Sequence, residues 1–237
     1  MTTLTIPTRF RGPPHSGNGG YVAGLLAKAA GGHRAVAMRA PAPLDVALTL
    51  DLTSEPVRLF HGDTLVADAA LASPGDLATP PIVPTLEQAR AASAEYQSYH
   101  PICVCCGDKL SAAEGLRILA GPIAGAPEGT VAAVWDVDAA FCDDDGIAPE
   151  EVVWTAIDCP GFYAWVAHDG RHGALTGRMQ AEVLERPRAG DQCIVLAWPL
   201  ERVSERRRTA GVALFTTDGR LLARGVQTWI AVVRRAE

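Results

Sequence analysis

Residues 149–167 constrain the fold more than any other part of this chain, because they predict a helix without a polar face. Pro149 is a favoured first residue of a helix, and the predicted helix runs from there to about Ala167. Its apolar side chains surround the helix axis: Val152, Val153, Trp154, Ile157, Phe162, Tyr163, Trp165 and Val166. Such a helix must be enclosed by other elements rather than lie on a surface.

Strands are expected on both sides of this helix. Residues 175–183 alternate with a period of two, which is typical of a strand. Residues 209–216 and 221–233 meet across Asp218-Gly219, a strong hairpin signal. Three further strands are expected at 116–119, 131–137 and 194–200.

The first part of the chain repeats this order of elements. A helix is predicted from about Gly20 to Ala30, and strands follow at 46–53 and 64–72. Residues 73–99 then carry four prolines and one short polar helix at 86–96, so they form a linker or crossing segment. Each half therefore has one helix and several antiparallel strands, which predicts an α+β protein with an internal repeat.

Composition excludes several classes of partner. A net charge of −6 disfavours nucleic acid and anionic membrane surfaces. The first residues show no signal-peptide pattern, and no apolar run approaches the roughly 20 residues that span a bilayer. The six cysteines are expected to be reduced thiols, and the expected compartment is the cytoplasm.

Five segments, in order, resemble the double hot-dog acyl-CoA thioesterases and their relatives. They are RGPPHSGNGGYVAG (11–24), HPICVCCGDKLSAAEGLRILAG (100–121), VWTAIDCPG (153–161), LTGRM (175–179) and DGRLLARGVQTWIA (218–231). The resemblance implies two antiparallel sheets, each wrapped around a central helix. We expect hot-dog units at 1–73 and 100–237, joined by a Pro-rich crossover at 74–99, and we include a homodimer among the expected assemblies.

The same resemblance implies an enzyme that hydrolyses acyl-CoA or a thioester on a carrier protein's phosphopantetheine arm. Coenzyme A then enters only as part of the substrate, and no other cofactor is expected. A non-catalytic acyl-binding or scaffold protein of this fold is one alternative. A hydratase or dehydratase is another, but such hot-dog enzymes resemble one another in an Asp-x4-His pattern. Here Tyr163 stands five residues after Asp158, and the next histidine is His168.

Asp158 is the first candidate for catalysis. A carboxylate inside an apolar helix is costly unless it is paired or functional, and burial raises its pKa toward that of a useful general base. Pro160 removes a helix hydrogen bond, so we expect the helix to kink beside Asp158. The alternative is that Asp158 only caps the second helical segment.

Gln227 and Thr176 are the next candidates. Gln227 lies on a mostly apolar strand face, where it either serves a site or satisfies a strand edge. In acyl-CoA thioesterase II-like proteins an Asp, a Gln and a Ser or Thr hold the attacking water, and Asp158, Thr176 and Gln227 match that pattern. Regular alternation, however, places Thr176 on the face of Arg178 and Gln180.

The glycine-rich helix start at 16–21 predicts an oxyanion hole. Glycines at 19 and 20 let N–H groups approach a ligand, and a helix start favours negative charge. Asn18 and His15 are further candidate donors for the substrate. The alternative is plain helix capping.

Three cysteines, at positions 103, 105 and 106, lie close together in the sequence. No second pair accompanies them, since Cys142, Cys159 and Cys193 stand alone, so we expect buried thiols and no metal. Cys159 is not expected to be a nucleophile, because no His accompanies it at a recognisable spacing.

Overall fold

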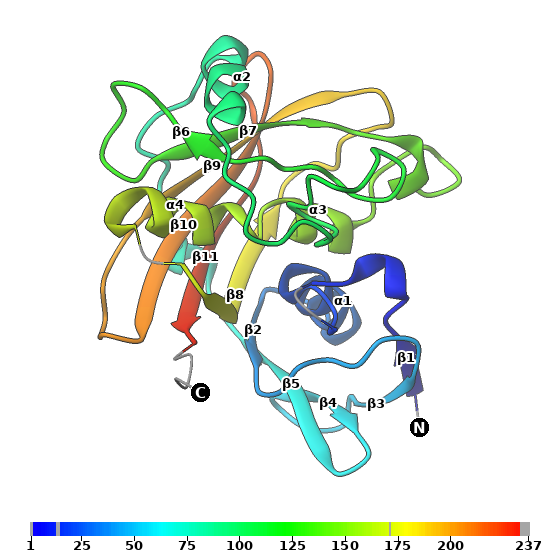
Figure 1. The fold of residues 1–237 in the computed structure, drawn as a ribbon. Coiled ribbons are helices and arrows are strands. Elements are labelled where there is room, and N and C mark those ends of the chain that lie inside the picture. Colours follow the sequence, from blue (N-terminus) through cyan, green and yellow to red (C-terminus); the bar gives the residue numbers. More distant parts are fainter. Residues whose placement is uncertain (1, 13–14, 171, 233–237) are drawn as a thin grey trace.

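The structure is a computed structural model that describes residues 2–12, 15–170 and 172–232 (Figure 1). Pro13 and Pro14 of the first glycine-rich segment and Val233 of the last predicted strand lie outside the described residues. The strands are β1 (Thr2–Thr5), β2 (Arg34–Met38), β3 (Ala47–Asp51), β4 (Val57–His61), β5 (Thr64–Leu71), β6 (Gly121–Pro122), β7 (Val131–Asp136), β8 (Ala174–Val183), β9 (Gln192–Pro199), β10 (Arg207–Thr216) and β11 (Leu221–Ala231). The helices are α1 (Gly19–Ala30), α2 (Leu86–Ala94), α3 (Glu150–Ala156) and α4 (Pro160–Asp169), with 3-10 turns at Thr8–Phe10, Pro74–Asp76 and Ala139–Phe141.

One antiparallel sheet contains all the strands of the described residues. Its order is β1-β3-β4-β5-β2-β8-β11-β10-β9-β7-β6, so strands from the two halves of the sequence stay at opposite ends. The halves join where β2 pairs with β8, with Ala35 opposite Gln180 and Val36 opposite Met179. The predicted α+β class with a large antiparallel sheet is confirmed.

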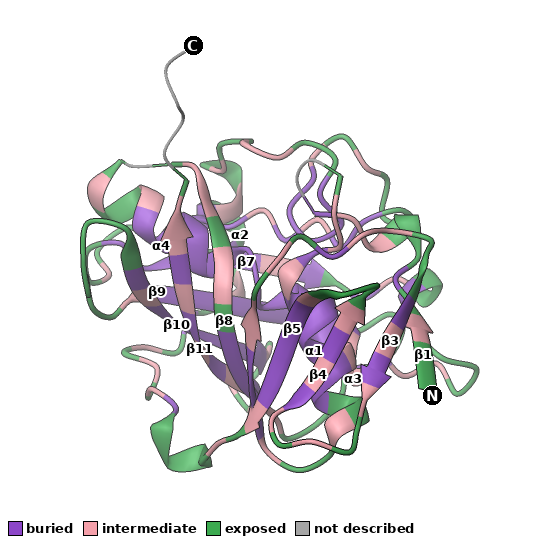
Figure 2. Ribbon diagram, turned by 90° about the horizontal axis from the view of Figure 1, so that it is seen from below, coloured by how far each residue is buried: buried purple, intermediate pink, exposed green. Residues whose placement is uncertain are grey.

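Helix α1 is the buried helix of the N-terminal half. Seven of its residues are buried, including Val22 and Leu26, and it packs on β2, β4 and β5. Figure 2 shows this buried stretch of α1 behind β4 and β5. The helix begins at the Asn18 cap and ends at Gly31, which adopts a left-handed φ of 68°.

Helices α1 and α3 touch through glycines. A Cβ on Gly20 would lie 2.5 Å from the Trp154 carbonyl oxygen, and one on Gly24 would lie 2.7 Å from Cα of Glu151. Only residues without a side chain allow so close an approach. The two helices that come from the two halves therefore pack in direct contact.

The apolar helix predicted at 149–167 is two helices. Helix α3 ends at the cap residue Ile157 and α4 begins at Pro160, so the kink predicted at the proline is confirmed. Helix α4 packs on β7, β9 and β10, whereas α3 lies mainly against α1. The short segment between α3 and α4 carries Asp158.

The Pro-rich segment between the halves contributes α2, close to the predicted helix at 86–96. Thr85 and Gln88 form a reciprocal capping box at its start. Ala89 and Ala92 pack with Ile194 and Leu196 in a second apolar cluster. The segment therefore covers part of the C-terminal sheet, and the predicted boundaries at 73 and 100 stay predictions.

The strand predicted at 116–119 is wrong. Leu116 and Ile118 are buried there, but their N–H groups donate to the carbonyls of Val104 and Cys105 at 2.7 and 2.8 Å. Arg117 adopts a left-handed φ of 55°, which no strand residue has. The segment folds against the cysteine-rich loop, and β6 begins only at Gly121.

Candidate functional site

Asp158 lies at the break between α3 and α4 with only 2% of its surface exposed. Its carboxylate accepts three hydrogen bonds from other elements. Asn18 Nδ2 donates to Oδ2 at 3.0 Å, Thr176 Oγ1 donates to Oδ1 at 2.9 Å, and the Gly20 N–H also donates to the group. The fold thus brings four of the predicted site residues to one point.

A β-bulge explains how Thr176 reaches this carboxylate. Thr228 pairs with Arg178 and Trp229 pairs with Thr176, so Gly177 is an extra residue on β8. The bulge turns Thr176 to the inner face of the sheet, the face of Trp229. The placement of Thr176 with Arg178 that regular alternation predicted is therefore wrong.

Burial raises the pKa of Asp158 to about 7, because the charged carboxylate loses its hydration. The hydrogen bonds from Gly20, Thr176 and Asn18 act in the opposite direction, since they favour the charged form. A carboxylate with a pKa near 7 is partly ionised at neutral pH and accepts a proton efficiently there.

Gln227 is fully buried, and its amide faces the backbone at the helix break. Its Nε2 donates to the carbonyl oxygens of Ile157 and Asp158, both at 2.9 Å, and its Oε1 accepts from Trp229 Nε1 at 2.9 Å. A Cβ on Gly161 would lie 1.8 Å from Gln227 Oε1, so this approach needs a glycine. Gln227 thus supplies a donor to the Ile157 carbonyl and a second donor to the Asp158 carbonyl, which also accepts from the Gly161 N–H at 3.3 Å. Its predicted contact with a catalytic water stays a prediction.

The first turn of α1 lies on the other side of the carboxylate. Asn18 Oδ1 accepts from the Tyr21 N–H at 3.0 Å, while its Nδ2 donates to the Asp158 carboxylate. The Gly20 N–H donates to the Asp158 carboxylate. Gly19 borders the cavity described next, as does the exposed His15. Of the two glycines predicted as oxyanion donors, Gly19 lines the cavity and Gly20 contacts Asp158.

A cavity of about 440 Å³ opens in front of Asp158. Its volume lies within the range of small-molecule sites. Its walls come from both halves, with residues 38–42 on one side and 174–177 on the other. The walls are mostly apolar, and their larger side chains are Met38, Pro41, Phe162, Leu175, Trp229 and Ile230.

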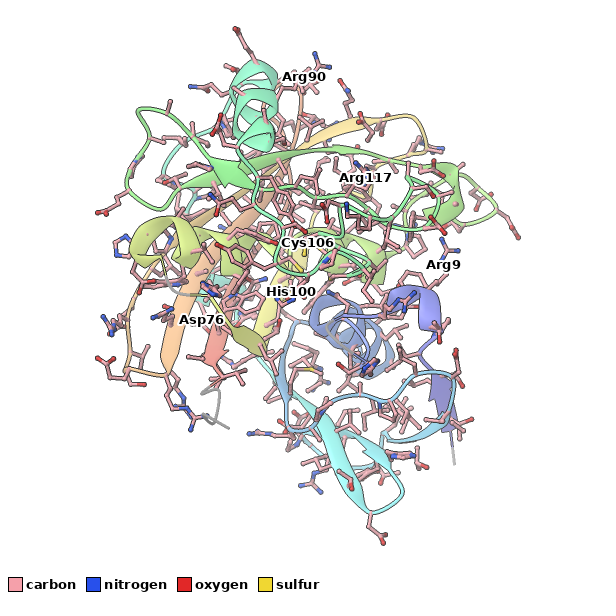
Figure 3. All side chains as sticks on the ribbon, in the orientation of Figure 1. Arg9, Asp76, Arg90, His100, Cys106 and Arg117 are labelled. Atoms are coloured by element: carbon pink, nitrogen blue, oxygen red, sulfur yellow. The ribbon has the colours of Figure 1, made fainter. Side chains whose placement is uncertain are left out.

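Buried thiols lie near the Asn18 amide that donates to Asp158. The Sγ atoms of Cys103, Cys106 and Cys159 lie within 4.8 Å of one another, and those of Cys103 and Cys159 are 3.7 Å apart. Figure 3 shows Cys106 and His100 on the loop that crosses beside α1 and the α3–α4 pair. Cys159 stands alone in the sequence, but the fold places it against the cysteine-rich loop.

Neither the family models nor the curated protein sequences match this chain. Among solved structures, a protein from Novosphingobium aromaticivorans with a provisional thioesterase name superposes with a TM-score of 0.63. The match covers 98% of this chain and 95% of that one at 17% identity. The chain therefore has the hot-dog fold.

Two shorter hot-dog structures also align with this chain. The PaaI protein of the E. coli phenylacetic acid degradation operon has a TM-score of 0.45 at 13% identity and covers 53% of this chain and 87% of its own. Thioesterase superfamily member 2 of Mus musculus has a TM-score of 0.42 at 19% identity and covers 49% and 84%. The resemblance to hot-dog proteins is confirmed at the level of the fold by the Novosphingobium aromaticivorans structure with its TM-score of 0.63.

Sequence analysis did not single out some residues at this site. Trp229 lines the cavity. It could have been identified from the sequence, because it stands two residues after Gln227 and so lies on the same face of the strand. His100 also lines the cavity, and burial lowers its pKa. Its contact with Phe162 depends on the irregular loop, for which the sequence has no periodic signal.

No described helix is long enough to cross a bilayer, since the longest, α1, has 12 residues.

Proposed function

We propose that this protein hydrolyses acyl thioesters of coenzyme A or of a carrier's phosphopantetheine arm, with water activated by Asp158. The observation that carries the proposal is the position of Asp158. It is a carboxylate with a pKa near 7 at the wall of an apolar cavity of about 440 Å³. An apolar cavity accommodates an acyl chain, and a base at its wall accounts for attack by water.

The reaction requires one proton acceptor and one oxyanion site. Asp158 takes a proton from water while the water oxygen attacks the thioester carbonyl carbon. The oxyanion that forms accepts from the Gly19 N–H at the positive end of α1. When the C–S bond breaks, the thiolate leaves and takes the proton from Asp158, so the products are a carboxylic acid and a free thiol.

In this proposal Thr176 and Asn18 fix the orientation of the carboxylate and keep its pKa from rising further. Gln227 is a positioning residue, because it holds the backbone of Ile157 and Asp158 in place. His15 lies at the exposed part of the cavity, where it contacts the polar part of the substrate.

The proposal includes two hot-dog units. Strands β1–β5 with α1 form the first, and strands β6–β11 with α3 and α4 form the second. Each unit alone is incomplete as an enzyme, because Asn18 and Gly19 come from the first and Asp158 and Thr176 from the second.

A hydratase mechanism receives no support from the residues after Asp158. The Tyr163 hydroxyl is within 2.8 Å of the Tyr96 hydroxyl and does not line the cavity. His168 lies beside Trp165 and Glu128, likewise outside the cavity lining. The experiment below distinguishes a non-catalytic acyl-binding protein from a thioester hydrolase.

The test is a screen of acyl-CoA esters and acyl-pantetheines with detection of free thiol, followed by Asp158→Asn. The asparagine is nearly isosteric but cannot take a proton, so we expect turnover to fall by about 10²–10⁴. Asp63→Asn, in the exposed turn between β4 and β5, is the matched control and should keep full activity. Wild-type protein that binds these esters without thiol release would be an acyl-binding protein, and near-normal turnover of Asp158→Asn would move the base elsewhere.

A further inference from the structure

The buried thiols beside Asp158 have the geometry of a metal site. Cys103, Cys106 and Cys159 each offer one sulfur, and these three atoms lie within 4.8 Å of one another. Zinc–sulfur bonds of about 2.3 Å in a tetrahedron place neighbouring sulfurs about 3.8 Å apart. The distance of 3.7 Å between the sulfurs of Cys103 and Cys159 matches that edge.

The loop that carries two of these cysteines is shaped around a sulfur. Cys103 and Cys106 have the C-x2-C spacing of zinc sites. The N–H groups of Cys105 and Cys106 donate to the Cys103 sulfur, and the Gly107 N–H donates to the Cys103 carbonyl at 2.7 Å. A Cβ on Gly107 would lie 2.5 Å from that carbonyl oxygen, so the tight turn needs a glycine.

A second layer of contacts surrounds the sulfurs. Asn18 Nδ2 lies 3.8 Å from the Cys103 sulfur and 4.0 Å from the Cys159 sulfur, and it donates to Asp158 as well. Side chains that donate to ligand atoms in this way orient them around an ion. The thiol of Cys105 also interacts with that of Cys159, but its sulfur is not one of the three that lie within 4.8 Å of one another.

We propose that Cys103, Cys106 and Cys159 bind a thiophilic divalent cation, zinc, through their three sulfurs. The expectation of no metal rested on the isolation of Cys159 in the sequence. In the folded protein, however, the Cys159 sulfur lies 3.7 Å from the Cys103 sulfur. The bound ion would fasten the loop at 103–107 to the break between α3 and α4, and so hold Asp158 in place.

The first test uses unmodified full-length protein without an affinity tag. After expression with added zinc and extensive dialysis, elemental analysis should find about one zinc ion per chain. After removal of zinc with a chelator under reducing conditions, cobalt(II) should produce thiolate-to-metal charge-transfer absorption and the intense visible bands of a tetrahedral site. Wild-type protein that retains no zinc and takes up no cobalt overturns the proposal, as does an oxidised protein in which a disulfide accounts for these thiols.

Variants then locate the site. Cys103→Ser and Cys106→Ser should each lower zinc retention at least about tenfold, because each removes one of few ligands. Cys193→Ser is the matched control, since Cys193 is also buried but lies on β9 outside the cluster. Equal zinc retention in Cys103→Ser, Cys106→Ser and wild type contradicts the assignment. If a variant fails to fold, the cobalt spectrum of the wild type still shows whether the protein has a thiolate metal site.

Discussion

The side-chain amide of Asn18 joins the start of α1 to the Asp158 carboxylate, with Nδ2 3.0 Å from Oδ2 across 140 positions of sequence. The same amide caps α1 through its Oδ1. A cap is worth about 1 kcal/mol to a helix, so this side chain contributes to folding whatever its role in the site. Stability and site geometry are therefore coupled at Asn18.

The rate of thioester hydrolysis should follow the ionisation of Asp158. Because burial raises its pKa to about 7, kcat/KM should rise with pH through about 7 and level off above it. Thr176→Val removes a hydrogen bond that lowers this pKa, so its midpoint should move to higher pH. Thr228→Val is the control, since Thr228 lies on the neighbouring strand opposite Arg178, whereas Thr176 is the residue that donates to Asp158. Identical midpoints for Thr176→Val and wild type would mean that Asp158 does not set the profile.

Asp158 should also make the stability of the protein pH-dependent. Its folded pKa lies above the ordinary value of 3.8, so between about pH 4 and 7 the folded state binds more protons than the unfolded state. The free energy of unfolding therefore falls as pH rises through this window. Relative to Asp158→Asn, the wild type should lose about 2–4 kcal/mol between pH 4 and pH 7. Urea unfolding of both proteins at several pH values measures this difference, and a difference that stays constant contradicts the assigned pKa.

Gln227→Ala should destabilise the fold as well as the site. It removes the Gln227 partner of the Ile157 carbonyl and of the indole N–H of Trp229, and it removes one of the two donors to the Asp158 carbonyl, which also accepts from the Gly161 N–H at 3.3 Å. Each unsatisfied buried group costs about 1–3 kcal/mol, so the free energy of unfolding should fall by at least about 2 kcal/mol. Gln192→Ala, at a partly exposed position of β9, should cost less than about 1 kcal/mol. Equal stability of the two variants would show that the amide is not needed at the break.

Gly20→Ala tests the close contact of α1 with the helix break. Alanine favours a helix over glycine by about 1 kcal/mol, but here its Cβ would lie 2.5 Å from the Trp154 carbonyl oxygen and 2.6 Å from Asp158 Cβ. Overpacking costs about 1–3 kcal/mol, so we expect net destabilisation and a loss of turnover as Asp158 shifts. Gly75→Ala is the control, because its Cβ would meet only Ser73 Oγ, at 3.4 Å. A Gly20→Ala protein as stable and as active as wild type would contradict this packing.

The sequence predicted those parts of the fold that depend on periodic patterns. The enclosed apolar helix, its kink at Pro160 and the long C-terminal strands follow from residue spacing alone. Thr176 could not be placed this way, because one extra residue at Gly177 changes the face of every residue before it. The proximity of Cys159 to Cys103 was equally hidden, since it depends on how an irregular loop packs against a helix break.

The glycine contact between α1 and α3 has a consequence for how the chain can vary. Gly20 and Gly24 face Trp154 and Glu151 without room for one additional carbon atom. A change on either helix thus requires a compensating change on the other, although the two are separated by more than half of the chain. Chimaeras that combine halves of different hot-dog proteins should succeed only when both helices come from the same parent.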